Sequence, residues 1–108
     1  MNSSEVINSY GIYNKSFTLI MDSFKSFPEI EKVIIYGSRA MGNYKKGSDI
    51  DLAIIGDHIT LNTVNKLSAK LNEDLPIPYY FDVLDYKSLS NINLKNHIDE
   101  EGKLIYER

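Results

Sequence analysis

Residues 33–55 read VIIYGSRAMGNYKKGSDIDLAII, and the architecture of the whole chain can be worked out from this segment. Both ends are apolar runs rich in branched side chains, which have the composition and length of buried strands. Between them lie Gly37-Ser38, a short spacer and Ser48-Asp49-Ile50-Asp51. The pattern predicts a strand over about 32–36, a tight loop containing a helical turn, and a second strand over about 49–55.

The two aspartates of this segment are predicted to project side by side. Residues two apart in a strand point to the same face, so Asp49 and Asp51 share one face while Ile50 and Leu52 take the other. Two neighbouring carboxylates repel each other unless a cation lies between them. Hard oxygen ligands next to a phosphate-bearing substrate favour Mg²⁺.

The loop before the aspartates has the composition of a phosphate-binding loop. Gly37 lets the backbone approach an anion closely, and Ser38 adds a hydroxyl where a helical turn begins. Arg39, Lys45 and Lys46 are candidate phosphate contacts. Arg39 is the preferred one, since the two lysines are equally well explained as basic side chains of a solvated loop.

Length and charge restrict the class of protein. A chain of 108 residues forms one domain, 1–108, with little surface to spare for a large substrate. Twelve basic and fifteen acidic residues give a net charge of -3, which disfavours general nucleic-acid binding. Cysteine is absent, and no apolar run approaches the ~18 residues of a membrane span. We expect a soluble, cytoplasmic protein whose residues 1–9 are partly frayed.

The remaining elements follow from apolar periodicity. One helical stripe ends at Pro28, and a second follows Thr60 as a possible N-cap; the stripes consist of Tyr13, Phe17, Ile20, Met21 and Phe24, and of Leu61, Val64, Leu67, Leu71 and Leu75. A third strand is predicted over 79–84. A last helix over 92–101 with Gly102 as its C′ residue precedes a short extended segment, 104–106.

A third carboxylate interrupts the predicted strand 79–84. Asp82 stands in an otherwise apolar run, where an unpaired carboxylate is costly, so it is the natural third member of the site. The alternative is that Asp82 lies on an exposed edge and that Asp85 is the functional acid. His58 and His97 have no second ligand at usable spacing, and we interpret both as surface or helix histidines.

The segment resembles the signature of the DNA polymerase β-type nucleotidyltransferases. The resemblance rests on Gly37-Ser38-Arg39-Ala40, a glycine, and Ser48-Asp49-Ile50-Asp51-Leu52 between two apolar runs. It implies an α/β (α+β) fold, a small mixed sheet backed by helices. It also implies nucleotidyl transfer, in which a hydroxyl attacks the α-phosphorus of a nucleoside triphosphate and pyrophosphate leaves.

The resemblance assigns a role to each site residue. Asp49 and Asp51 would hold two Mg²⁺ ions, and Asp82 would complete the second ion's shell and could accept the proton of the attacking hydroxyl. The nucleotide, ATP, would be bound by Gly37, Ser38, Arg39 and Ser48. One position departs from the family pattern, because many members carry an arginine where this chain has Met41.

A chain this short is similar to the minimal nucleotidyltransferases of bacteria and archaea. That subgroup is typically the antitoxin of a two-protein module, and it neutralises a HEPN-domain ribonuclease toxin by transferring AMP to one of its tyrosines. The resemblance thus implies a hetero-oligomer. Two alternatives remain: a binding-only antitoxin that occludes its partner, and a transferase acting on a small hydroxyl compound.

Overall fold

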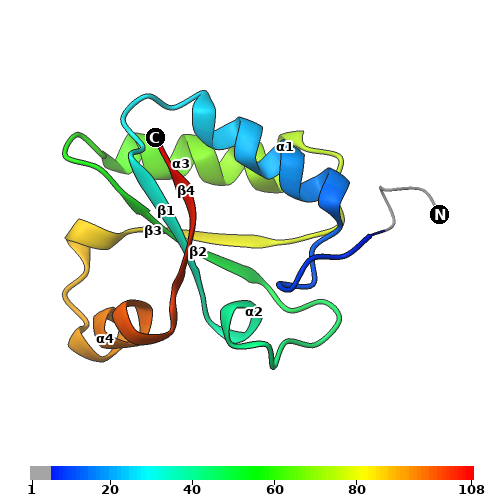
Figure 1. Ribbon diagram of the computed structural model, residues 1–108. Coiled ribbons are helices and arrows are strands. Elements are labelled where there is room, and N and C mark those ends of the chain that lie inside the picture. The colour runs from blue at the N-terminus through cyan, green and yellow to red at the C-terminus, as the bar shows by residue number, and fades with distance from the viewer. Residues whose placement is uncertain (1–5) are drawn as a thin grey trace.

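The computed structural model describes residues 6–108 as a four-stranded sheet with helices on both faces (Figure 1). In chain order the elements are α1 (Asn14–Lys25), β1 (Lys32–Tyr36), α2 (Ser38–Met41), β2 (Ile50–Ile55), α3 (Leu61–Ala69), the wide turn η2 (Lys70–Asp74), β3 (Phe81–Asp85), the short turn η3 (Tyr86–Ser88), α4 (Ile92–Glu101) and β4 (Lys103–Glu107). The strands are ordered β3-β2-β1-β4. This architecture confirms the predicted α/β fold with a small mixed sheet.

Strand direction follows from the connections. The short loop through α2 makes β1 and β2 antiparallel, whereas the long connection through α3 lets β3 run parallel to β2. β4 pairs antiparallel with the free edge of β1, with a register shift between Val33 and Ile34. The predicted extended segment 104–106 is therefore an edge strand of the sheet.

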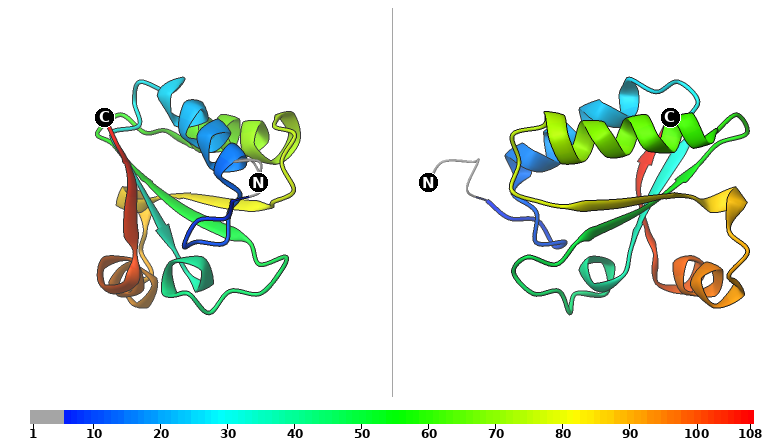
Figure 2. Two further views of the ribbon diagram at one scale, coloured as in Figure 1. Left: turned by 45° about the vertical axis from the view of Figure 1, so that its right-hand side comes forward. Right: turned by 180° about the vertical axis from the view of Figure 1, so that it is seen from behind.

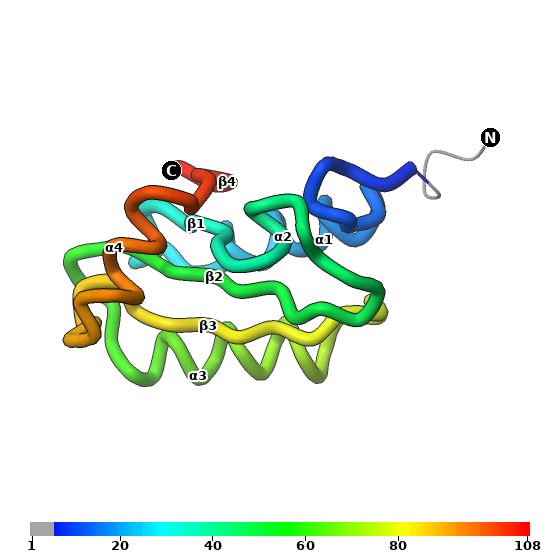
Figure 3. The backbone as a smooth tube through the Cα atoms, turned by 90° about the horizontal axis from the view of Figure 1, so that it is seen from below, coloured from blue at the N-terminus to red at the C-terminus, as the bar shows by residue number. Residues whose placement is uncertain are grey.

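The two faces of the sheet carry different side chains. One face is apolar and is covered by α1 and α3, which lie on the same side in every view (Figures 1 and 2). Its buried residues are Ile12, Ile20, Phe24, Ile30, Val33, Ile35, Ile50, Leu52, Ile54, Leu67, Leu71 and Phe81. The other face has a smaller cluster of Tyr36, Ala53 and Ile98, and α2 and α4 lie over it (Figure 3).

The two predicted apolar stripes are mostly confirmed. Ile20 and Phe24 of α1 are buried, and α3 begins with Thr60 as its N-cap in a reciprocal capping box with Thr63. Two members were wrongly predicted to join the core: Tyr13 is 38% exposed and stands directly before α1, and Leu61 is 75% exposed. It is the first residue of α3, and the helix meets the sheet only from its following turns.

Gly102 follows α4 for a different reason from the one predicted. Its φ of -68° is not left-handed, so the expected C′ conformation is absent. A Cβ on Gly102 would instead lie 2.4 Å from the carbonyl oxygen of Ile98 and 2.5 Å from a methyl carbon of Ile34. Glycine is needed here because the chain passes so close to α4 and β1 as it enters β4.

Strands β2 and β3 start slightly later than predicted, at Ile50 and Phe81. The start of β3 is fixed by Asn72 of η2, whose side chain accepts the Phe81 N–H at 2.7 Å and donates to the Phe81 carbonyl at 3.1 Å. The side-chain amide of Asn72 in η2 is thus hydrogen-bonded to the backbone of Phe81, the residue just before Asp82.

The segment before α1 is organised by Asn8 and an isolated bridge between Ile7 and Tyr13. The Asn8 side-chain oxygen accepts the N–H groups of Tyr10 and Ile12. Of the predicted frayed stretch 1–9, residues 1–5 lie outside the described part of the chain. No helix within residues 6–108 combines the length and the apolar character needed to cross a bilayer.

Candidate active site

Two of the predicted carboxylates, Asp51 and Asp82, lie side by side on the sheet face that α4 covers. Asp51 of β2 lies directly across from Asp82 of β3, and on its other side it pairs with Tyr36 of β1. Asp49 immediately precedes β2 and is two residues from Asp51. We call Asp49, Asp51 and Asp82 the carboxylate site.

The alternative acid, Asp85, lies at the far end of β3. It pairs in register with Ile54, three residues beyond Asp51. Its side chain caps the turn η3 by accepting the Lys87 N–H and the Ser88 hydroxyl. The alternative is correct that Asp82 is exposed on an edge strand of the sheet, but strand register brings Asp82, and not Asp85, next to Asp51.

The carboxylate site carries more negative charge than its surroundings balance. Burial and, to a smaller extent, the charges of Asp82 and Asp49 together raise the pKa of Asp51 to about 6; a positive charge on His97 would act in the opposite direction. Burial, followed by the charges of Asp51 and Asp82, likewise raises the pKa of Tyr36 above its usual value. A cation between the strands would remove this repulsion, so the donor set is chemically suited to a divalent metal.

The side chains are not arranged as a finished metal cage. Among residues 6–108, no three histidine or acidic side chains converge closely enough to hold an ion by themselves. Two of the three carboxylates are fixed on neighbouring strands, and Asp49 stands at the end of a loop. This arrangement suits an ion whose remaining ligands come from a bound substrate.

Gly37 connects β1 to α2 and lies against the carboxylate site. It has a left-handed φ of 74°, and a Cβ there would lie 2.4 Å from a carboxylate oxygen of Asp51. The Gly37 N–H donates to Nε2 of His97 at 3.2 Å. Sequence reasoning excluded His97 because no second ligand stands at usable spacing. Sixty residues separate it from Gly37, and only the placement of α4 over β1 brings them together.

Arg39 anchors the loop before Asp49. Its side chain is only 3% exposed, and its guanidinium makes four hydrogen bonds to the backbone carbonyls of Ser48, Tyr10 and Gly11. The rings of Tyr44 and Tyr79 each have their centroid 5.3 Å from the guanidinium carbon. The predicted contact between Arg39 and phosphate is untested, and the observed partners give Arg39 a positioning role.

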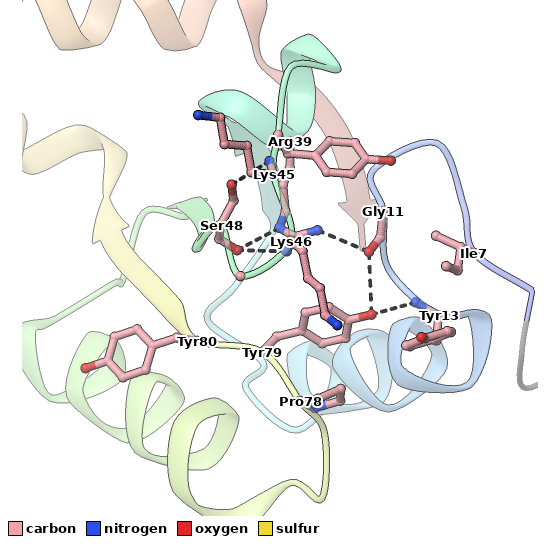
Figure 4. Close-up of a pocket in the computed structure, with 12 residues that line it drawn as sticks. Ile7, Gly11, Tyr13, Arg39, Lys45, Lys46, Ser48, Pro78, Tyr79 and Tyr80 are labelled. Atoms are coloured by element: carbon pink, nitrogen blue, oxygen red, sulfur yellow. Dashed lines mark hydrogen bonds between the residues drawn. The ribbon is translucent and has the colours of Figure 1, made fainter.

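A cavity of about 510 Å³ adjoins this loop (Figure 4). Tyrosine rings and two lysines line much of it, among them Tyr13, Tyr44, Tyr79, Tyr80, Lys45 and Lys46. Ser48 also lines it, and its hydroxyl accepts the Lys45 N–H. The carboxylate site is not part of the lining, so the cavity lies beside the acidic residues and does not enclose them.

Met41 ends α2 with its side chain 49% exposed. The position where many polymerase β-type enzymes have an arginine is thus open to solvent in this chain. Lys45 and Lys46 follow it in the same loop and are also exposed. Cationic side chains therefore remain available within a few residues of the position that Met41 occupies.

Comparisons with known proteins agree with this geometry. The family model for polymerase beta, nucleotidyltransferase, matches residues 19–108. A relative from Methanocaldococcus jannaschii, which bears the name "putative protein adenylyltransferase", is 31% identical over 80 residues. The match covers 71% of this chain and 79% of the relative.

Solved structures share the fold at low sequence identity. A toxin-antitoxin crystal structure with AMP-PNP matches with a TM-score of 0.66 and 21% identity over 87% of this chain and 73% of the other. The toxin-antitoxin MntA-HepT matches with a TM-score of 0.64 and 20% identity over 87% and 72%. A protein from Shewanella oneidensis matches with a TM-score of 0.62 and 20% identity over 88% and 73%.

Proposed function

The chain belongs to the polymerase β nucleotidyltransferase family, and from this we propose that it transfers AMP from ATP onto a hydroxyl group of a partner protein. The observation that carries the proposal is the strand register, which sets Asp82 beside Asp51, together with the close approach of Gly37 to the Asp51 carboxylate. Two carboxylates on adjacent strands can bind a metal ion while the neighbouring glycine turn binds a phosphate. The relative named as a protein adenylyltransferase supports the choice of acceptor class.

The chain's own residues supply the chemistry as follows. Asp49, Asp51 and Asp82 would hold Mg²⁺, which when bound neutralises phosphate charge and acidifies a hydroxyl. The acceptor oxygen attacks the α-phosphorus, the bond to the β-phosphate oxygen breaks, and pyrophosphate leaves. Asp82, on the outer strand β3, accepts the proton of the acceptor hydroxyl.

The phosphates are placed at the Gly37-Ser38 turn. Gly37 lets the backbone come close to the phosphates. Its own N–H does not bind them, because it donates to His97. Ser38 contributes its hydroxyl at the first residue of α2, and Ser48 stands directly before Asp49. Arg39 holds Ser48 in place through two hydrogen bonds to the Ser48 carbonyl.

We further propose that the partner is a HEPN-domain toxin, that the acceptor is a tyrosine, and that the chain acts as its antitoxin. Support comes from the shared fold with toxin-antitoxin structures, one of which was solved with AMP-PNP, an analogue of ATP. A protein acceptor brings its own binding surface.

The test is the intact mass of the protein encoded beside this gene after incubation with the chain, Mg²⁺ and each nucleoside triphosphate in turn. We expect a gain of one or more AMP groups, and loss of the gain with Asp51→Asn. Asp57→Asn is the matched control, because Asp57 is an exposed acid beyond the other end of β2 that pairs with Lys87. That variant should transfer AMP normally.

Three outcomes would contradict the proposal. Full transfer by the Asp51→Asn variant would refute the role of the carboxylate site. No mass gain, together with a stable complex that silences the neighbour, would favour an antitoxin that acts by occlusion. No gain and no complex would point to a small hydroxyl compound as the acceptor.

A further inference from the structure

His97 occupies a specific place beside the carboxylate site. It lies on α4, and its Nε2 accepts the N–H of Gly37 at 3.2 Å. Its ring meets the ring of Tyr36 edge-on, with centroids 6.1 Å apart and an interplanar angle of 77°. The imidazole is therefore held on two sides, by the last residue of β1 and by the turn that follows it.

Gly37 lies directly against the side chain of Asp51. The backbone passes so close that a Cβ would overlap a carboxylate oxygen of Asp51. The same peptide leads into Ser38 and the first turn of α2. A rotation of the Gly37 peptide would thus move the start of α2 and change the space available to the Asp51 carboxylate.

The hydrogen bond also defines the form of the imidazole. A nitrogen that accepts an N–H carries no proton, so Nε2 is unprotonated and the ring proton is on Nδ1. A side chain of another type can keep this function only if it presents an acceptor at the same place. This requirement distinguishes a positioning role from simple packing against Tyr36.

We propose that His97 is a positioning residue that holds the Gly37 peptide and so fixes the Gly37-Ser38 turn against Asp51. It acts through the turn and does not contact the reacting atoms. The effect on catalysis rests on the proposed nucleotidyl transfer, whereas the hydrogen bond and its effect on Gly37 do not. The two can therefore be tested separately.

Two substitutions separate hydrogen bonding from packing. His97→Gln presents a carbonyl oxygen that can accept the Gly37 N–H, whereas His97→Phe keeps an aromatic ring against Tyr36 and has no acceptor. Asn96→Ala, at an exposed neighbouring position of α4, is the control. We expect kcat/KM for ATP to fall by about tenfold to a hundredfold in His97→Phe and by less than about threefold in His97→Gln.

A readout without nucleotide tests the hydrogen bond itself. Amide hydrogen exchange at Gly37 should become at least about tenfold faster in His97→Phe and stay close to the wild-type rate in His97→Gln and Asn96→Ala. In the wild-type protein, nitrogen-15 NMR of the imidazole should show Nδ1 protonated and Nε2 unprotonated at about pH 8. This last measurement needs no variant to fold.

The proposal is overturned if Nε2 carries the proton in the wild-type protein, or if Gly37 keeps its exchange protection in His97→Phe. Equal losses of activity in His97→Phe and His97→Gln would also overturn it, since packing or charge would then explain the effect. If the wild-type protein transfers no nucleotide at all, the proposed function fails. The exchange and tautomer measurements still decide the role of His97 in that case.

Discussion

Replacing Asp51 by asparagine should abolish transfer and also make the metal-free protein more stable at neutral pH. The pKa of Asp51 is raised from 3.8 to about 6, so ionising this carboxyl costs more in the folded protein than in the unfolded chain. At 1.36 kcal/mol per pKa unit the cost is at most about 3 kcal/mol. Asp51 is only half-buried and water screens part of the effect, so we expect about 1–2 kcal/mol.

The pH dependence follows from the direction of the shift. Below about pH 4 the carboxyl is protonated in both states, and Asp51 and asparagine should behave alike. As the pH rises from about 4 to about 6, the unfolded chain gives up the proton while the folded protein still holds it, so the stability of the wild-type protein relative to Asp51→Asn falls until the folded protein is ionised as well. The full advantage of the variant is therefore reached at about pH 8.

Urea unfolding of both proteins in a chelating buffer at about pH 4, 6 and 8 measures this difference. For a domain of this size, 1 kcal/mol corresponds to a change in Tm of about 4–8 °C. Asp57→Asn is the control, and its effect on stability should have the opposite sign. A hydrogen bond from Lys87 lowers the pKa of Asp57, so the folded protein favours the charged carboxylate that the substitution removes. Mg²⁺ should stabilise the wild-type protein and have little effect on Asp51→Asn.

The reasoning is refuted if Asp51→Asn is less stable than the wild-type protein at about pH 8. It is also refuted if the difference between the two proteins is the same at about pH 4 and pH 8. Either result would mean that burial and the charges of Asp82 and Asp49 do not raise the pKa of Asp51 in the folded protein.

Three further substitutions test the positions around the site. Arg39→Lys should lose about 2–4 kcal/mol in chemical denaturation, because a lysine cannot replace four hydrogen bonds to three carbonyls; a loss below about 0.5 kcal/mol would contradict the anchoring role. Asn72→Ala should cost about 2–3 kcal/mol by the same measurement and lower transfer, since the Phe81 backbone loses both side-chain partners beside Asp82; normal stability would show that the pair is dispensable. Gly102→Ala should lower the free energy of unfolding by about 1–3 kcal/mol through overlap with Ile98 and Ile34, and an unchanged Tm would show that the chain can move aside.

The sequence predicts those features of the site that depend on neighbours in the chain. Asp49 and Asp51 are predicted to share a face by strand alternation, although β2 begins only at Ile50, and the loop through Gly37 makes β1 and β2 antiparallel. Asp82 could be proposed as the third acid because a carboxylate interrupts an apolar run. Its register opposite Asp51 agrees with that expectation, and its role in catalysis remains a prediction.

The features that sequence reasoning missed all depend on distant contacts. His97 hydrogen-bonds to Gly37 only because α4 lies over β1. Asn72 hydrogen-bonds to Phe81 only because α3 continues into the wider helical turn η2. Arg39 looked like a phosphate ligand because it follows a Gly-Ser pair. Its buried position depends on carbonyls of Tyr10 and Gly11, which no local pattern links to it.

The sheet order also determines when the domain can complete its folding during synthesis. β1 lies between β2, which follows it closely in the chain, and β4, which is separated from it in the chain by seven other elements. Pairing of such distant segments is slow, because a long loop must close before any contact is gained. On the ribosome, β1 to β3 and the carboxylate site can assemble first. The edge of β1 that pairs with β4 stays unpaired until residues 103–107 have emerged. A nascent chain stalled before that point would expose this edge to pairing with other chains.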